Sequence, residues 1–183
     1  MNYYRCENSD CGFLAEEEPD VCPHCGGTFF LSVDEEELTG SDWVQLGNRA
    51  VDEERNTDAL ACYQQAAAAG DVLGLTNLGW CLEAGVGVEA DPRQAVVLYA
   101  QAAAQDYMPA LTNLGYCYAH GVGVARDDDK AVECFRKGAE NGFPRAQFLL
   151  GEAYSRGLGV ERSDEDRKST RQNSSHIRRS RMP

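Results

Sequence analysis

The apolar positions between residues 41 and 165 follow a helical spacing that recurs at a fixed distance along the chain. Copies of the dipeptide Leu-Gly at residues 78–79, 114–115 and 150–151 recur at intervals of 36 residues. Three further sets keep the same interval: Gly85, Gly121 and Gly157; Gly87, Gly123 and Gly159; Val88, Val124 and Val160. Self-similarity at this period is typical of solenoids built from short supersecondary units.

Each unit is predicted to be a pair of helices. The first helix of the second unit has one apolar face, formed by Gly74, Leu78, Cys81 and Leu82. Residues 85–88 (Gly-Val-Gly-Val) end this helix, because glycine accepts the left-handed conformation that follows a helix. Asp91-Pro92 is a typical start for the second helix. The buried stripe of that helix is predicted to be Ala95, Leu98, Tyr99, Ala102 and Ala103.

The glycine-rich turns could also suggest a phosphate-binding loop. Such a loop requires a strand before it, whereas these turns follow helices and occur three times, so a repeat turn is favoured. The units are expected at residues 41–70, 71–106, 107–142 and 143–165, with the last one truncated. The first unit lacks a four-residue loop insertion, because 12 residues separate Gly47 from Ala59 but 16 separate Gly79 from Ala95.

Residues 114–142, LGYCYAHGVGVARDDDKAVECFRKGAENG, resemble the Sel-one-like repeat, a relative of the tetratricopeptide repeat. The resemblance covers about residues 41–165, and it implies a right-handed α-superhelix that assembles protein complexes, often in bacteria. A secreted branch of the family pairs two cysteines in each repeat. Cys62, Cys81, Cys117 and Cys134 lack that pairing pattern and are expected to be small core residues.

The first 25 residues contain the other four cysteines, Cys6, Cys11, Cys22 and Cys25. Their spacing, C-x4-C-x10-C-x2-C, supplies two close pairs across a short loop, as a tetrahedral thiolate site requires. Four ordinary core cysteines are the alternative. A segment of about thirty residues has too little core to fold unaided, so metal coordination is expected to stabilise it.

Residues 22–26, Cys-Pro-His-Cys-Gly, resemble the second knuckle of the rubredoxin-like zinc ribbons, whose pattern is CxxCG…CPxCG. The first knuckle departs from it, with four residues between its cysteines where two are usual. The resemblance implies structural zinc, and the longer first turn disfavours the alternative of an iron electron-transfer site. A zinc thiol redox switch is a further alternative. The expected fold class is therefore mainly α: an α-solenoid of helix-pair repeats (an α/α superhelix) preceded by a small β zinc ribbon at residues 1–31.

The net charge of −13 narrows the range of partners. Residues 166–183 contain six basic and one acidic residue, which leaves 11 basic and 29 acidic residues, a charge of −18, in residues 1–165. A body this acidic repels nucleic acid and anionic membranes, so a basic protein or peptide partner is expected. With no apolar signal core or long apolar run, a cytoplasmic location is predicted.

Two segments lie outside the modules. Residues 32–40 are predicted to be an acidic linker. Residues 166–183 are predicted to be a disordered basic tail, and a nucleic-acid-binding arm is the alternative. The tail resembles the translation of a sequencing-library adapter, DRKSTRLNSSH…SRMP, and is expected to be artefactual. The natural solenoid would then continue beyond residue 165.

Partner binding is predicted on the stripe beside the core face of each first helix. The stripe comprises Leu73, Asn77, Trp80 and Ala84; then Pro109, Asn113, Tyr116 and His120; then Arg145, Leu149, Glu152 and Arg156. Asn77, Trp80, Asn113, Tyr116 and His120 are the candidate binding residues, because groove aromatics anchor bound segments. Alternatively, the rings only pack at repeat junctions. No catalytic arrangement is found, so the chain is predicted to be a non-enzymatic protein–protein interaction scaffold or adaptor.

Overall fold

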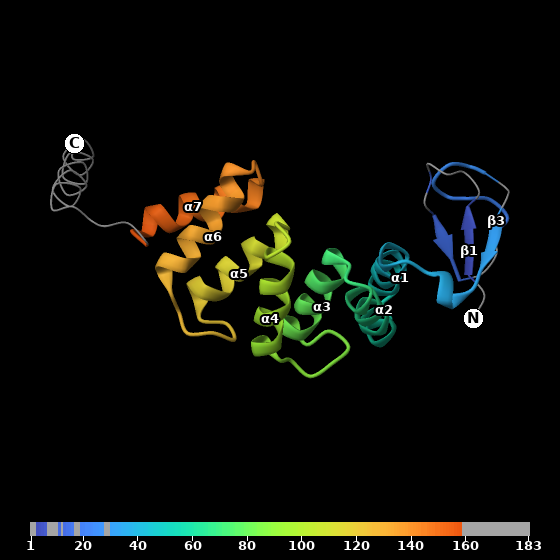
Figure 1. Cartoon of the computed structure of the whole chain (residues 1–183), viewed down its shortest axis with the longest axis horizontal. Helices are drawn as coiled ribbons and strands as arrows, with labels where there is room; N and C mark the ends of the chain where they lie inside the picture. The colour runs from blue at the N-terminus through green and yellow to red at the C-terminus, as the bar shows by residue number, and fades with distance from the viewer. Residues whose placement is uncertain (1–2, 7–10, 12, 17–18, 28–29, 159–183) are drawn as a thin grey trace, which may run out of the picture.

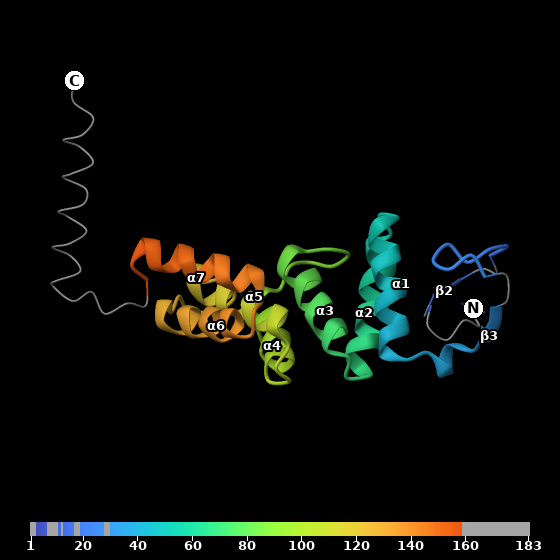
Figure 2. The same ribbon diagram turned by 90° about the horizontal axis from the view of Figure 1, so that it is seen from above.

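The computed structural model describes residues 3–6, 11, 13–16, 19–27 and 30–158. The molecule is elongated, with a small sheet at one end followed by a row of helices (Figures 1 and 2). The described helices are α1 (Gly40–Asp52), α2 (Asn56–Ala68), α3 (Val72–Ala84), α4 (Pro92–Ala103), α5 (Met108–His120), α6 (Asp128–Glu140) and α7 (Pro144–Arg156). Each packs mainly against its neighbours in the chain. The expected fold class, an α-solenoid after a small antiparallel sheet, is confirmed.

The N-terminal sheet has three antiparallel strands in the order β2-β1-β3. These are β1 (Tyr3–Cys6), β2 (Leu14–Ala15) and β3 (Phe30–Val33). Strand β3 crosses the boundary predicted after residue 31, because Val33 pairs with Tyr3 and is buried. The predicted linker therefore begins inside this strand. It continues as the short 3₁₀-helix η1 (Glu35–Glu37), whose three acidic side chains are exposed.

The predicted helix ends are confirmed. Gly85, Gly121 and Gly157 follow α3, α5 and α7, and each has a positive φ between 69° and 75°. The Asp91 side chain accepts hydrogen bonds from the backbone N–H groups of Arg93 and Gln94, at 3.1 Å each. This bonding satisfies two of the donors that the start of a helix leaves free.

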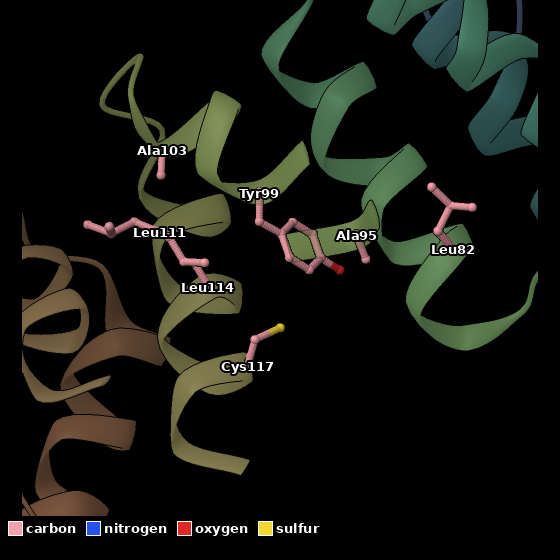
Figure 3. Close-up of a cluster of buried hydrophobic side chains, with 7 residues drawn as sticks. All are labelled: Leu82, Ala95, Tyr99, Ala103, Leu111, Leu114 and Cys117. Atoms are coloured by element: carbon pink, nitrogen blue, oxygen red, sulfur yellow. The ribbon is translucent and has the colours of Figure 1, made fainter. Parts of the chain in front are cut away.

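A glycine of the first helix faces an aromatic ring of the second helix in each complete repeat. A Cβ at Gly47, Gly79 or Gly115 would lie 2.5–2.8 Å from the ring of Tyr63, Tyr99 or Phe135, respectively. Tyr99 lies in the middle of a cluster with Leu82, Ala95, Ala103, Leu111, Leu114 and Cys117 (Figure 3). Only glycine lets the two backbones approach closely enough to enclose the ring.

Successive repeats are joined by pairs of small residues. Ala66 of α2 faces Gly74 of α3, and Gly138 of α6 faces Ala146 of α7, at positions 72 residues farther along. At the position between them, Ala102 and Ala110 are fully buried in one cluster. Neighbouring helices therefore approach one another closely both within repeats and between them.

The second glycine of each Gly-Val-Gly turn makes a further contact between repeats. A Cβ at Gly87 would overlap the carbonyl oxygen of Asn56, and a Cβ at Gly123 would overlap that of Pro92. Asn56 and Pro92 begin the second helix of the preceding repeat. Each turn therefore rests on the backbone of the repeat before it.

Helix α7 is the last helix of the described chain. No described helix packs on its outer face. Gly151 occupies the position of Gly79 and Gly115, but nothing lies within 4 Å of its Cβ position. Phe148 is 70% exposed, whereas Thr112, at the same repeat position, is fully buried. The predicted tail at residues 166–183 lies outside the described residues.

We expect Gly123→Ala to lower the free energy of unfolding by about 2–4 kcal/mol, because the methyl group would overlap the Pro92 carbonyl and φ is positive. Gly70→Ala is the matched control, since Gly70 has a φ of +78° and open space around it. The control should lose only the backbone cost, about 1–2 kcal/mol. Urea denaturation measures both, and equal losses would contradict a stabilising role for the turn.

Candidate functional site

The four N-terminal cysteines come together at one end of the sheet. Their sulfur atoms all lie within 4.8 Å of one another, with Cys6 and Cys25 3.6 Å apart and Cys11 and Cys22 3.5 Å apart. Four thiolates bound at ~2.3 Å to one tetrahedral ion would lie about 3.8 Å apart. None of the chain's eight cysteines, all of which belong to the described residues, forms a disulfide. The cluster is therefore compatible with metal binding.

The second knuckle supports its sulfurs with backbone groups. The N–H of Gly26 donates to the carbonyl of Cys22 at 2.8 Å, which closes the turn, and Gly26 has a φ of +73°. The backbone N–H of Gly27 hydrogen-bonds the Cys25 sulfur and, together with Cys6, lowers the pKa of that thiol to about 7. Hydrogen bonds of this kind favour the thiolate, the form that binds a metal.

The sheet packs directly on helix α1. Tyr3, Leu14 and Val33 form one cluster with Leu46, and the Tyr3 and Trp43 rings meet edge to face at 6.0 Å. Arg49 of α1 donates to the carbonyl of Leu14 in β2. The interface was not predicted, because the sequence suggested two modules joined by a solvated linker.

Asp42 is the polar centre of this interface. Its carboxylate accepts from Arg5 of β1 at 2.7 Å, from the Thr39 backbone at 2.8 Å and from the Thr39 hydroxyl at 2.6 Å. Asp42 occupies the repeat position of Gly74 and Ala110, which contact the second helix of the preceding repeat. Strand β1 therefore takes the place of a preceding helix.

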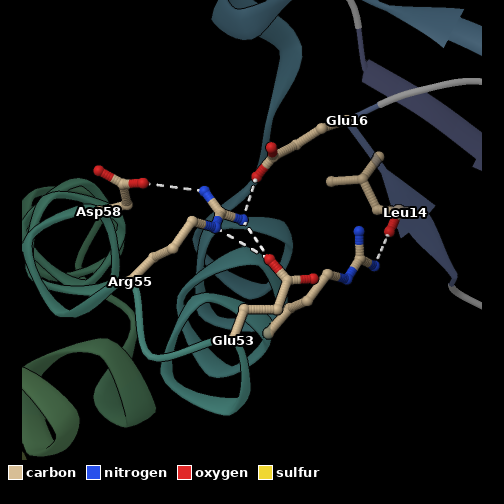
Figure 4. A network of polar contacts seen from close by, with 6 residues as sticks. Leu14, Glu16, Glu53, Arg55 and Asp58 are labelled. Carbon is tan, nitrogen blue, oxygen red and sulfur yellow. Dashed lines mark hydrogen bonds and ion pairs between the residues drawn. The ribbon is translucent and has the colours of Figure 1, made fainter.

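A second polar group ties the sheet to the turn between α1 and α2. Arg55 lies among Glu16, Glu53 and Asp58 (Figure 4), with donor–acceptor distances of 2.9–3.3 Å. These side chains are at least a third exposed, so water screens the ion pairs and each adds little stability.

A pocket of about 520 Å³ opens on the helical part of the chain. Its lining comes mainly from first helices, with contributions from α4 and from the residue before α5: Thr76, Asn77, Trp80, Glu83, Tyr99, Tyr107, Pro109, Asn113, Tyr116 and Arg145. Trp80 remains 41% exposed. Four of the five candidate partner residues, Asn77, Trp80, Asn113 and Tyr116, are thus brought together.

The fifth candidate, His120, does not line the pocket. Its ring stacks on Tyr116, with centroids 4.1 Å apart, and its Nδ1 lies 3.0 Å from the Tyr116 carbonyl oxygen. Asn77 donates to Asn48 of the first repeat at 3.3 Å, and Asn48 also accepts from the Tyr63 hydroxyl at 2.8 Å.

Glu83 and Tyr99 line the pocket but were not among the candidates. The Tyr99 hydroxyl donates to the Glu83 carboxylate at 2.7 Å, and burial, with this bond, raises the pKa of Tyr99. Tyr99 was assigned only to the core stripe. Glu83 lies three residues after Trp80, and that spacing on a helix was the signal that could have identified it.

Comparison with protein-family models gives one match, to the Sel1 repeat. The matched segments are residues 47–71, 72–107, 109–143 and 144–167. A comparison with curated protein sequences gives no match.

Two solved structures share the fold. The crystal structure of a Sel1 repeat protein from Oxalobacter formigenes is 28% identical, with a TM-score of 0.64 over 73% of this chain and 55% of that one. A protective antigen present in uropathogenic Escherichia coli strains, displaying an SLR fold, is 32% identical, with a TM-score of 0.64 over 78% of this chain and 32% of that one. The chain thus spans about half, or a third, of the length of these proteins.

No helix in the described part of the chain combines the length and the apolar character needed to cross a membrane.

We expect Asp42→Ala to lower the free energy of unfolding by about 2–3 kcal/mol, since the buried carboxylate accepts three hydrogen bonds. Asp58→Ala removes an exposed ion pair with Arg55 and should cost at most about 1 kcal/mol. Chemical denaturation followed by circular dichroism measures both. A loss no larger for Asp42→Ala than for Asp58→Ala would contradict a stabilising role for the contact between the sheet and α1.

Proposed function

Because the chain belongs to the Sel1 repeat family, whose members commonly serve as scaffolds for protein partners, we propose that it is a non-enzymatic interaction scaffold. The observation that carries the proposal is the pocket between α3 and α5, where Trp80 and Tyr116 occupy equivalent positions in neighbouring repeats. The exposed Trp80 ring and the half-buried Tyr116 ring lie beside amide groups. Such a surface suits an extended peptide, because rings bury apolar area while amides pair with the peptide backbone. Asn77, Asn113 and, through its stacking on Tyr116, His120 complete the binding surface.

The N-terminal module is proposed to be a structural zinc ribbon. The sulfur–sulfur distances suit a tetrahedral ion, and four thiolates fill its coordination sphere, which leaves no position for a catalytic water. Cys6, Cys11, Cys22 and Cys25 would hold the ion. Bound zinc would fix the turns that carry β1 and β2, and these strands cover the exposed end of α1.

The acidic chain is proposed to bind a basic protein or peptide in the cytoplasm. The charge of −18 in residues 1–165 supports this choice and disfavours nucleic acid. Iron electron transfer and a zinc thiol redox switch remain the alternatives for the ribbon. A visible absorption spectrum distinguishes bound iron from zinc, and zinc release by peroxide distinguishes a switch from a structural site.

The purified chain should contain one zinc ion, and Cys22→Ala should contain none, because three thiolates bind the ion far less tightly. Cys134→Ala lies outside the cluster and should keep one ion. Acidification should release the zinc, since protons compete for the thiolates. Elemental analysis and a colorimetric chelator measure both effects. Equal zinc in both variants, with helical content retained, would contradict the site.

Peptides selected from a displayed random library against the full chain should bind the double variant Trp80→Ala/Tyr116→Ala at least about tenfold more weakly. Phe148→Ala is the control, because it removes a 70% exposed ring outside the pocket. Fluorescence polarisation measures the affinities. If the two rings only pack at repeat junctions, the double variant will instead show a large fall in melting temperature.

A further inference from the structure

The pocket holds a carboxylate whose position is fixed by the core. Glu83 is half-buried and accepts a hydrogen bond from the Tyr99 hydroxyl at 2.7 Å. The Tyr99 ring is fully buried against Gly79, so the hydroxyl has little freedom. Among the described residues, no basic side chain forms an ion pair with Glu83, and one hydrogen bond leaves most of its acceptor capacity free.

Aromatic side chains stand beside this carboxylate. Trp80 and Glu83 are three residues apart on α3, which places them on neighbouring parts of one helix face. Tyr116 of α5 lines the same pocket. A cation over an aromatic ring gains electrostatic stabilisation, and a carboxylate within hydrogen-bond reach adds a charge-assisted bond. Rings beside a carboxylate therefore match the stem and the charged end of a lysine or arginine side chain.

The charges around the pocket also define where a basic side chain would lie. Arg145 is the second residue of α7 and lines the pocket as its basic side chain, whereas Glu83 lies near the end of α3. A bound cation is repelled by Arg145, whose charge also acts on Tyr99, and is attracted by Glu83, so it lies against the Glu83 carboxylate. The acidic charge of the chain as a whole favours the approach of a basic segment.

We propose that this pocket binds one lysine or arginine side chain of an extended peptide segment, with its cation on Glu83 and its stem against Trp80 and Tyr116. The proposal rests on the proposed function, since it names the chemistry that the scaffold pocket selects. It differs from a purely structural role for Glu83, in which the carboxylate only holds the Tyr99 hydroxyl.

Glu83→Gln separates these roles. The glutamine keeps an oxygen that accepts from Tyr99, so folding is preserved, but it removes the charge that attracts a cation. Glu89→Gln is the matched control, because Glu89 is exposed in the turn after α3 and does not line the pocket. Melting temperatures of both variants verify that the fold is intact.

The probe is the set of library peptides whose binding requires Trp80 and Tyr116. Each peptide is resynthesised with its basic residues replaced one at a time, arginine by citrulline and lysine by norleucine. One replacement should weaken binding to the wild type about tenfold or more, as expected for a hydrogen bond to a charged group. Glu83→Gln should cause a similar loss for the parent peptide and almost none for the replaced peptide, whereas Glu89→Gln should leave both affinities unchanged.

Two results would overturn the proposal. Pocket-dependent peptides that lack basic residues, or that bind Glu83→Gln as tightly as the wild type, would exclude cation recognition while leaving the scaffold function intact. A library that yields no peptide dependent on Trp80 and Tyr116 would instead remove the proposed pocket function and, with it, this inference.

Discussion

The close approach of helix backbones is the constraint on which the solenoid depends. Inside a repeat, a glycine leaves room for an aromatic ring, as Gly79 does for Tyr99. Between repeats, a pair of small residues such as Gly74 and Ala66 serves the same purpose. Because the two contacts alternate along the described chain, each of the helices α2 to α6 is held at two places by neighbours close in sequence. The stability of such a protein is nearly a sum of local terms.

A solenoid must also solve the problem of its ends, where a helix face has no neighbour. At the N-terminal end, Asp42 replaces the small residue that contacts a preceding helix, and Arg5 of β1 donates a hydrogen bond to it. The apolar part of the same face is covered by Tyr3 and Leu14. The three-stranded sheet thus does for α1 what a helix does for α3 and α5. At the other end of the described chain, Phe148 and Gly151 show the same kind of face uncovered.

Much of the fold could be predicted because its determinants are local and periodic. Gly85 and Asp91 specify helix ends through the chemistry of a few neighbouring atoms, and the 36-residue interval carries that prediction to the other repeats. The four-cysteine cluster followed from spacing alone. Contacts between unlike modules could not be predicted in this way. The hydrogen bond between Arg5 and Asp42 joins residues 37 positions apart and occurs once. No repeat in the sequence therefore indicated it. Glu83 was missed because its significance comes from the Tyr99 hydroxyl, which extends from the core to the pocket wall.

The turn glycines have a mechanical consequence for ligand recognition. Gly123 rests on the backbone at Pro92, and this contact sets the separation between the second and third repeats. Trp80 and Tyr116 belong to these same two repeats, so a contact outside the pocket helps to set the width of the gap between their rings. A bulkier residue at the turn would push the two repeats apart and reduce the curvature of the superhelix. Glycines that do not line the groove therefore help to set its width.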